Sequence, residues 1–128
     1  MKIEHIAFNV SDPVTLADWY VRQFGLQVLR HLPEPNQTHF LGDSAGTVLE
    51  VYCNPPDQVP DYPSMDPLLF HLAFTSANPH ADAERLVAAG ASVLGEVRPD
   101  SDSLLIMMRD PWGIAFQLCK RSRALLPN

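Results

Sequence analysis

Apolar positions along the chain follow two periods, one typical of strands and the other of helices. Residues Ile3 to Val10 alternate loosely, with Ile6, Phe8 and Val10 on one side, which predicts a strand. The next apolar positions have helical spacing and form a predicted core stripe: Leu16, Trp19, Tyr20 and Phe24. Ser11-Asp12-Pro13 is a helix-start signature and Gly25 is a stop, so a helix is predicted between them.

Three short strands are predicted to follow, over residues 26–32, 38–41 and 47–53, with a turn at 42–46. In the third strand, period two places Glu50 on the face opposite Leu49 and Val51. Residues 54–67 then contain five prolines. Proline disrupts helices and inner strands, so this stretch is predicted to be an extended connector.

The second half of the chain repeats the order of the first. A strand is predicted over 68–75, a helix from Asn78-Pro79 to Gly90, and strands over 92–97, 104–109 and 114–120. Matching residues have nearly constant offsets: His71 follows His5 by 71 − 5 = 66 positions, and Gln117 follows Glu50 by 117 − 50 = 67. Such a repeat indicates two copies of one module.

The order strand–helix–strand–strand–strand, used twice, predicts an α+β fold with mostly antiparallel sheets and helices outside. We expect a single domain over residues 1–128. Its parts are a first module at 1–54, a Pro-rich connector at 55–66, a second module at 67–121 and a tail at 122–128. At 128 residues the chain is long enough to bury a stable core.

Four polar side chains occupy matched places within predicted strands: His5, Glu50, His71 and Gln117. Each would be costly to bury among apolar neighbours unless it is paired or ligates an ion. Two imidazoles, a carboxylate and an amide oxygen suit a divalent metal ion such as zinc, nickel, manganese or iron. Of the other histidines, His39 is a candidate cavity-lining residue and His80 is predicted to be exposed at a helix start.

Composition narrows the class of protein. The formal net charge is −6, and the only basic cluster is residues 120–123, so a nucleic-acid partner is not expected. No apolar run approaches the ~20 residues of a membrane span, and the N-terminus lacks signal-peptide features. Cys53 and Cys119 lack metal-type or redox spacing and are expected to be reduced, half-buried thiols. We expect a cytoplasmic protein.

These motifs together resemble one family. His-Ile-Ala-Phe at 5–8, Leu-Glu-Val-Tyr at 49–52, His-Leu-Ala-Phe at 71–74 and Asp-Pro-Trp-Gly-Ile-Ala-Phe-Gln-Leu at 110–118 are similar to the vicinal oxygen chelate superfamily. That group includes glyoxalase I, fosfomycin-resistance proteins, extradiol dioxygenases, methylmalonyl-CoA epimerase and bleomycin-resistance proteins. The resemblance covers residues 2–121. It implies two βαβββ modules with curled, mostly antiparallel sheets that enclose one cavity, a bidentate small-molecule substrate, a divalent metal and a homodimer.

The resemblance also implies the roles of individual residues. His5, Glu50 and His71 fall on family metal-ligand positions, and Gln117 falls where the family usually has a glutamate. A glutamine oxygen can ligate a metal but cannot take a proton at pH 7, so Glu50 is the candidate catalytic base. The same departure weakens a dioxygenase interpretation.

Three functions remain open from the sequence. The first is a metal-dependent glyoxalase-like enzyme with isomerase, epimerase or lyase chemistry. The second is a metal-free small-molecule binding protein of bleomycin-resistance type, with Trp19, Tyr52 and Trp112 lining a groove. The third is an interaction scaffold, for which the sequence offers little.

Overall fold

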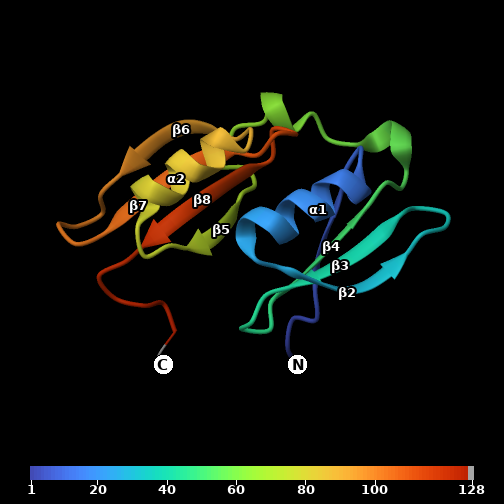
Figure 1. Ribbon diagram of the computed structural model, residues 1–128, viewed down its shortest axis with the longest axis horizontal. Coiled ribbons are helices and arrows are strands. Elements are labelled where there is room, and N and C mark those ends of the chain that lie inside the picture. Colours follow the sequence, from blue (N-terminus) through green and yellow to red (C-terminus); the bar gives the residue numbers. More distant parts are fainter. Residues whose placement is uncertain (127–128) are drawn as a thin grey trace. The chain divides into compact units, whose positions relative to one another are not determined.

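The structure, a computed structural model, describes residues 1–126 (Figure 1). The chain forms two compact units, Met1–Pro60 and a second that begins at Asp61. Each unit contains one strand–helix–strand–strand–strand module, so the two predicted modules are confirmed. Within residues 1–126, neither helix is long and apolar enough to span a membrane.

The first unit is one four-stranded sheet with a helix on one face (Figure 1). Its elements are β1 (Ile6–Asn9), α1 (Pro13–Phe24), β2 (Gln27–Leu32), β3 (Thr38–Gly42) and β4 (Val48–Tyr52). The strand order is β1-β4-β3-β2. β1 pairs with β4 in parallel, and the other two pairings are antiparallel, as a mostly antiparallel sheet requires.

The faces of this sheet follow the predicted alternation. Leu41, Leu49 and Val51 are buried, and so are Leu16 and Tyr20 of α1, which packs against β2, β3 and β4. Burial of apolar surface between helix and sheet is the main driving force for this packing. The opposite face carries Phe40 and Glu50, which line a pocket.

The start and end of α1 follow from local chemistry. The Asp12 carboxylate accepts the Thr15 N–H at 3.1 Å, and Pro13 occupies the first helical position. The helix ends at Gly25, whose φ of 71° is accessible to glycine at little cost.

The second unit repeats this architecture with β5 (Leu72–Thr75), α2 (Pro79–Ala88), β6 (Ser92–Val97), β7 (Leu104–Arg109) and β8 (Ala115–Lys120). The strand order is β5-β8-β7-β6, with β5 parallel to β8. Helix α2 packs against β6, β7 and β8 (Figure 1). Both Cys53 and Cys119 are unpaired and half-buried, as expected.

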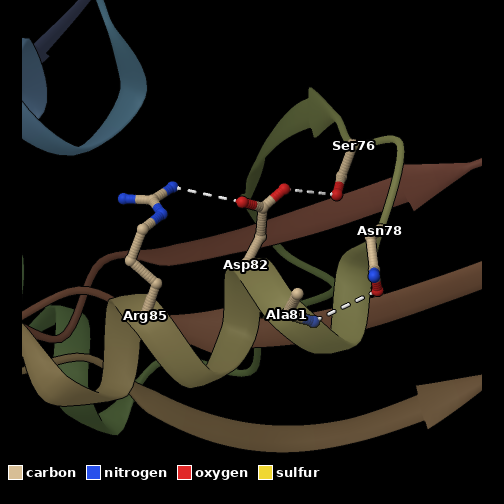
Figure 2. A network of polar contacts seen from close by, with 5 residues as sticks. All are labelled: Ser76, Asn78, Ala81, Asp82 and Arg85. Carbon is tan, nitrogen blue, oxygen red and sulfur yellow. Dashed lines mark hydrogen bonds and ion pairs between the residues drawn. The ribbon is translucent and has the colours of Figure 1, made fainter.

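A polar network fixes the start of α2 (Figure 2). Asn78 caps the helix because its side-chain oxygen accepts the Ala81 N–H at 3.2 Å. One turn on, the Asp82 carboxylate accepts the Ser76 hydroxyl at 2.6 Å and an Arg85 N–H at 3.4 Å. The network therefore ties the end of β5 to the first turns of α2.

Two expectations from the sequence need correction. His5 and His71 do not lie within strands, because β1 begins at Ile6 and β5 at Leu72. The first paired residues of the two parallel ladders are Ile6 with Leu49 and Leu72 with Phe116, so each histidine precedes its ladder by one position. The Pro-rich connector is not wholly extended, since Pro56–Gln58 and Tyr62–Ser64 form short 3₁₀ turns. Proline is compatible with the first position of such turns.

Candidate functional site

In the first unit, His5 and Glu50 come together at the open face of the sheet. The parallel pairing of β1 with β4 sets Ala7 opposite Glu50, and His5 lies two positions before Ala7 on the same side. The His5 Nε2 atom is 2.9 Å from Glu50 Oε2. About one third of the His5 side chain is exposed (34%), against 18% for Glu50. Two of the four predicted site residues are therefore in direct contact.

Carboxylates engage both nitrogens of the His5 ring. Nε2 contacts Glu50, and Nδ1 contacts the carboxylate of the neighbouring Glu4. The hydrogen bond to Glu4 raises the pKa of His5, and the negative charges of Glu4 and Glu50 act in the same direction, while burial opposes them. A metal ion at Nε2 must displace a proton, so binding there strengthens as the pH rises.

A pocket of about 300 Å³ lies beside this pair. The residues that line it come from all four strands of the first unit or their ends: Glu4, His5, Leu29, Arg30, Phe40, Val48 and Glu50. The Phe40 ring meets the His5 ring edge to face, with centroids 5.8 Å apart. The volume is at the lower end of the range for small-molecule sites.

In the second unit, His71 is half-buried and precedes β5 as His5 precedes β1. Its Nδ1 is 2.9 Å from the Pro67 carbonyl oxygen. A carbonyl only accepts hydrogen bonds, so Nδ1 carries a proton, and in the neutral ring Nε2 then keeps its lone pair. This is the tautomer that a metal-ligating histidine needs.

Arg109 forms hydrogen bonds with the segment that precedes Pro67. Its guanidinium donates to the carbonyl oxygens of Tyr62 at 2.9 Å, Met65 at 2.7 Å and Gly113 at 3.0 Å. These bonds fasten residues 62–65 to the turn between β7 and β8. We infer that Arg109 positions the acceptor of the His71 hydrogen bond.

Gln117 lies on β8 opposite Ala73 of β5, just as Glu50 lies opposite Ala7. Its side-chain oxygen is 3.3 Å from the Cys119 sulfur, a weak donor. Within residues 1–126, no group of three or more His, Cys, Asp or Glu side chains could hold a metal ion alone. Each unit supplies one histidine and one oxygen donor of the predicted set.

Other residues predicted to line a cavity lie elsewhere. His39 does not line this pocket: it is 6% exposed, stacks on His31 at 4.1 Å between centroids, and hydrogen-bonds the Gln37 carbonyl. It belongs to the face of β3 opposite Phe40. Burial lowers the pKa of His39, the charge of His31 lowers it further, and the Gln37 carbonyl acts in the opposite direction.

The aromatic residues predicted to line a groove are also outside the pocket of the first unit. Trp19 packs on Tyr20 and Phe24 within α1, at 5.8 and 5.4 Å between ring centroids. Tyr52 shares the face of Glu50 but does not line the pocket, and Trp112 is half-buried in the turn before β8. His80 is exposed, as predicted, and pairs with Glu96 at 2.7 Å.

Comparison with known proteins places this architecture in a family. The sequence matches the family described as the Glyoxalase/Bleomycin resistance protein/Dioxygenase superfamily over residues 2–118. The chain belongs to this superfamily. Comparison with curated proteins gives no match.

Several solved structures share the fold. A glyoxalase family protein from Enterococcus faecalis is 27% identical, with a TM-score of 0.70, and the match covers 93% of this chain and 97% of that one. The fosfomycin resistance protein FosX from Listeria monocytogenes is 20% identical, with a TM-score of 0.71 and coverages of 93% and 92%. TnmS3, an antibiotic binding protein from Streptomyces sp. CB03234, is 24% identical, with a TM-score of 0.66 and coverages of 92% and 96%.

The donor atoms of these residues fit the divalent metal that the superfamily often uses. Two donors about 2.1 Å from one ion, at a right angle, stand about 3.0 Å apart. His5 Nε2 and Glu50 Oε2 are 2.9 Å apart, close to that separation. In each histidine, Nδ1 is also hydrogen-bonded to an oxygen atom, of Glu4 for His5 and of Pro67 for His71. Metal-ligating histidines usually make such a hydrogen bond with the ring nitrogen that does not bind the metal.

Sequence reasoning missed five residues of the pocket: Glu4, Leu29, Arg30, Phe40 and Val48. Glu4 was detectable, since it adjoins His5 in the sequence. Arg30 and Phe40 depend on the strand pairing of β2 with β3, which local patterns do not fix.

Proposed function

We propose that the protein is a divalent-metal-dependent, glyoxalase-like enzyme that acts on a small oxygen-chelating substrate by isomerase, epimerase or lyase chemistry. His5, Glu50, His71 and Gln117 would hold the ion. A zinc, nickel, manganese or iron ion suits this set, which contains nitrogen and oxygen donors only. Bound there, the ion supplies Lewis-acid polarisation of a substrate carbonyl.

The observation that carries the proposal is the similar hydrogen bonding of the two histidine rings. The Nδ1 atom of His5 is hydrogen-bonded to the Glu4 carboxylate, and the Nδ1 atom of His71 is hydrogen-bonded to the Pro67 carbonyl oxygen. For His5, Nε2 then faces Glu50 at 2.9 Å. For His71, Nε2 has no hydrogen bond within residues 1–126. A solvated surface histidine needs no protein hydrogen bond that fixes the orientation of its ring.

Glu50 is proposed as the proton carrier. It is the one carboxylate among the four side chains, and the neutral Gln117 cannot take its place. General acid–base catalysis needs a group that accepts a proton from the substrate and returns it. The pocket beside Glu50 has room for a small molecule.

Metal analysis of the purified protein tests the proposal. After growth in medium containing all four metals, we expect about one ion per chain, reduced to near zero in His71→Ala. His80→Ala is the matched control, because His80 is an exposed histidine outside the set. Gln117→Glu should bind the ion more tightly, since it adds a negative charge. A folded wild-type protein without metal would refute the proposal.

We also propose a homodimer, as the family resemblance implies, and a mixing experiment tests where the site forms. His5→Ala and His71→Ala chains are unfolded together and refolded. If the site uses the first unit of one chain and the second unit of its partner, mixed dimers regain one intact site in two. If each site lies within one chain, mixing restores no metal binding.

The second candidate function is metal-free binding of a small molecule, and Gln117 favours it because the neutral amide weakens the donor set. In this case the pocket of the first unit, with its apolar Leu29, Phe40 and Val48, holds the ligand. Ligand titrations followed by tryptophan fluorescence, with and without a chelator, separate the two functions. Binding that a chelator leaves unchanged supports this second function.

A further inference from the structure

The pocket of the first unit owes two of its lining residues to an irregularity in β2. Val28 pairs with Leu41 and Arg30 pairs with Phe40, so Leu29 is an extra residue, a β-bulge. In a regular strand, Leu29 and Arg30 would point to opposite faces. Here both line the pocket, and Leu29 also packs over Gly42. The bulge therefore turns Arg30 toward the site.

Arg30 is the one lysine or arginine among the residues that line this pocket. Its guanidinium has no hydrogen bond or ion pair within residues 1–126, whereas Glu4 and Glu50 both engage His5. An arginine offers a fork of donors that matches the two oxygens of a carboxylate or a phosphonate. The open positive charge in the pocket is therefore that of Arg30.

The position of Arg30 sets the shape of a ligand. Arg30 lies opposite Phe40, and Phe40 lies opposite Glu50, in one row across three strands. Neighbouring strands are about 4.8 Å apart, so the backbones at the ends of this row are about 10 Å apart. The Phe40 ring forms an apolar surface between the charged ends.

The matching row of the second unit has no charge. β6 has the same bulge, at Leu94, and Gly95 stands where Arg30 does, opposite Met107, which in turn lies opposite Gln117. A Cβ atom at Gly95 would meet nothing within 4 Å, so packing does not explain the glycine. The repeated bulge is a feature of the module, and the cation belongs to the first unit alone.

We infer that Arg30 binds the anionic group of the substrate, and that the substrate is a small organic anion with an apolar body. Its carboxylate or phosphonate contacts Arg30, its body lies on Phe40, and its reacting end faces His5 and Glu50. This assignment rests on the proposed function only in placing the substrate in this pocket.

Binding of simple probes to the metal-stripped full chain tests the inference. Phenylacetate, benzylphosphonate and the neutral phenylacetamide are titrated into ¹⁵N-labelled protein, and dissociation constants are taken from shifts of pocket amides. Wild-type protein should bind the anions about tenfold more tightly than the amide, as a charge-assisted bidentate contact does. The ratio between the two anions identifies the preferred oxyanion.

Three variants make the test specific. Arg30→Gln should abolish the preference for anions, and Arg30→Lys should keep part of it, because charge remains but the fork is lost. Arg22→Gln is the matched control: it removes one positive charge, as Arg30→Gln does, but Arg22 pairs with Asp18 on α1 at 2.9 Å. It should keep the full preference.

Equal binding of anions and amide by wild-type protein, or an anion preference that survives Arg30→Gln, would overturn the inference. The outcome is independent of metal analysis. If the chain binds no metal but Arg30→Gln loses the anion preference, the metal-enzyme proposal fails and the role of Arg30 remains. If metal binds and Arg30→Gln has no effect, this inference alone fails.

Discussion

The hydrogen bonds of Arg109 should contribute strongly to the stability of the second unit, and replacement of Arg109 by methionine tests this. Methionine keeps much of the aliphatic stem but removes three hydrogen bonds, of 2.9, 2.7 and 3.0 Å, to Tyr62, Met65 and Gly113. A hydrogen bond from a charged donor contributes about 1.5–3 kcal/mol. Arg109 is half-buried and water can replace part of the contacts, so we expect Arg109→Met to lower the free energy of unfolding by about 2–4 kcal/mol.

The assay must report on the second unit alone. In a Trp19→Phe background the remaining tryptophan is Trp112, in the turn before β8, so guanidinium titration followed by fluorescence monitors this unit. Arg98→Met is the matched control, since Arg98 is exposed and has no hydrogen bond or ion pair within residues 1–126. It should change stability by less than about 0.5 kcal/mol. An Arg109→Met protein as stable as this control would refute the reasoning.

Arg109→Met should also act on the site. If residues 62–65 detach, the Pro67 carbonyl is less well placed for His71 Nδ1. ¹⁵N spectra of the histidine rings should then show a mixture of tautomers for His71 and no change for the exposed His80. An unchanged His71 tautomer would separate the stability role of Arg109 from its positioning role.

Three further predictions concern the start of α2, the turn before β8 and the dependence of stability on pH. Asn78→Ala should lower the free energy of unfolding by about 1 kcal/mol, because α2 loses its cap; denaturant titration measures this. Gly113→Ala should cost about 2–4 kcal/mol, since its φ is 87° and the added Cβ would lie 2.4 Å from Pro63 Cγ, whereas Gly95→Ala should be nearly neutral. Because the pKa of His39 is lowered from 6.5, its contribution to stability is fully present above pH 6.5 and is lost as the pH falls below it. Denaturant titrations from pH 7.5 to 5 should therefore give a shallower decline for His39→Phe than for wild-type protein, and identical slopes would contradict this.

Sequence patterns predicted the elements well, because their causes are local. The start of α1 follows from Asp12 and Pro13, and its end from Gly25, all within one turn of the helix. The alternation around Glu50 correctly placed it on the face opposite Leu49 and Val51. Duplication was visible because the two modules keep the same order of elements and nearly constant offsets.

The sequence alone thus determined two α+β modules, their caps, and four polar positions at matched places. Tertiary structure decided the rest. The parallel pairing of β1 with β4 brings His5 to Glu50, and the Pro67 carbonyl sets the tautomer of His71. The β-bulge in β2 places the side chain of Arg30 on the face that carries the pocket. Periodicity specifies which way a side chain points relative to its own neighbours. It does not specify which distant strand pairs with it, and a one-residue bulge reverses the face of each residue that follows.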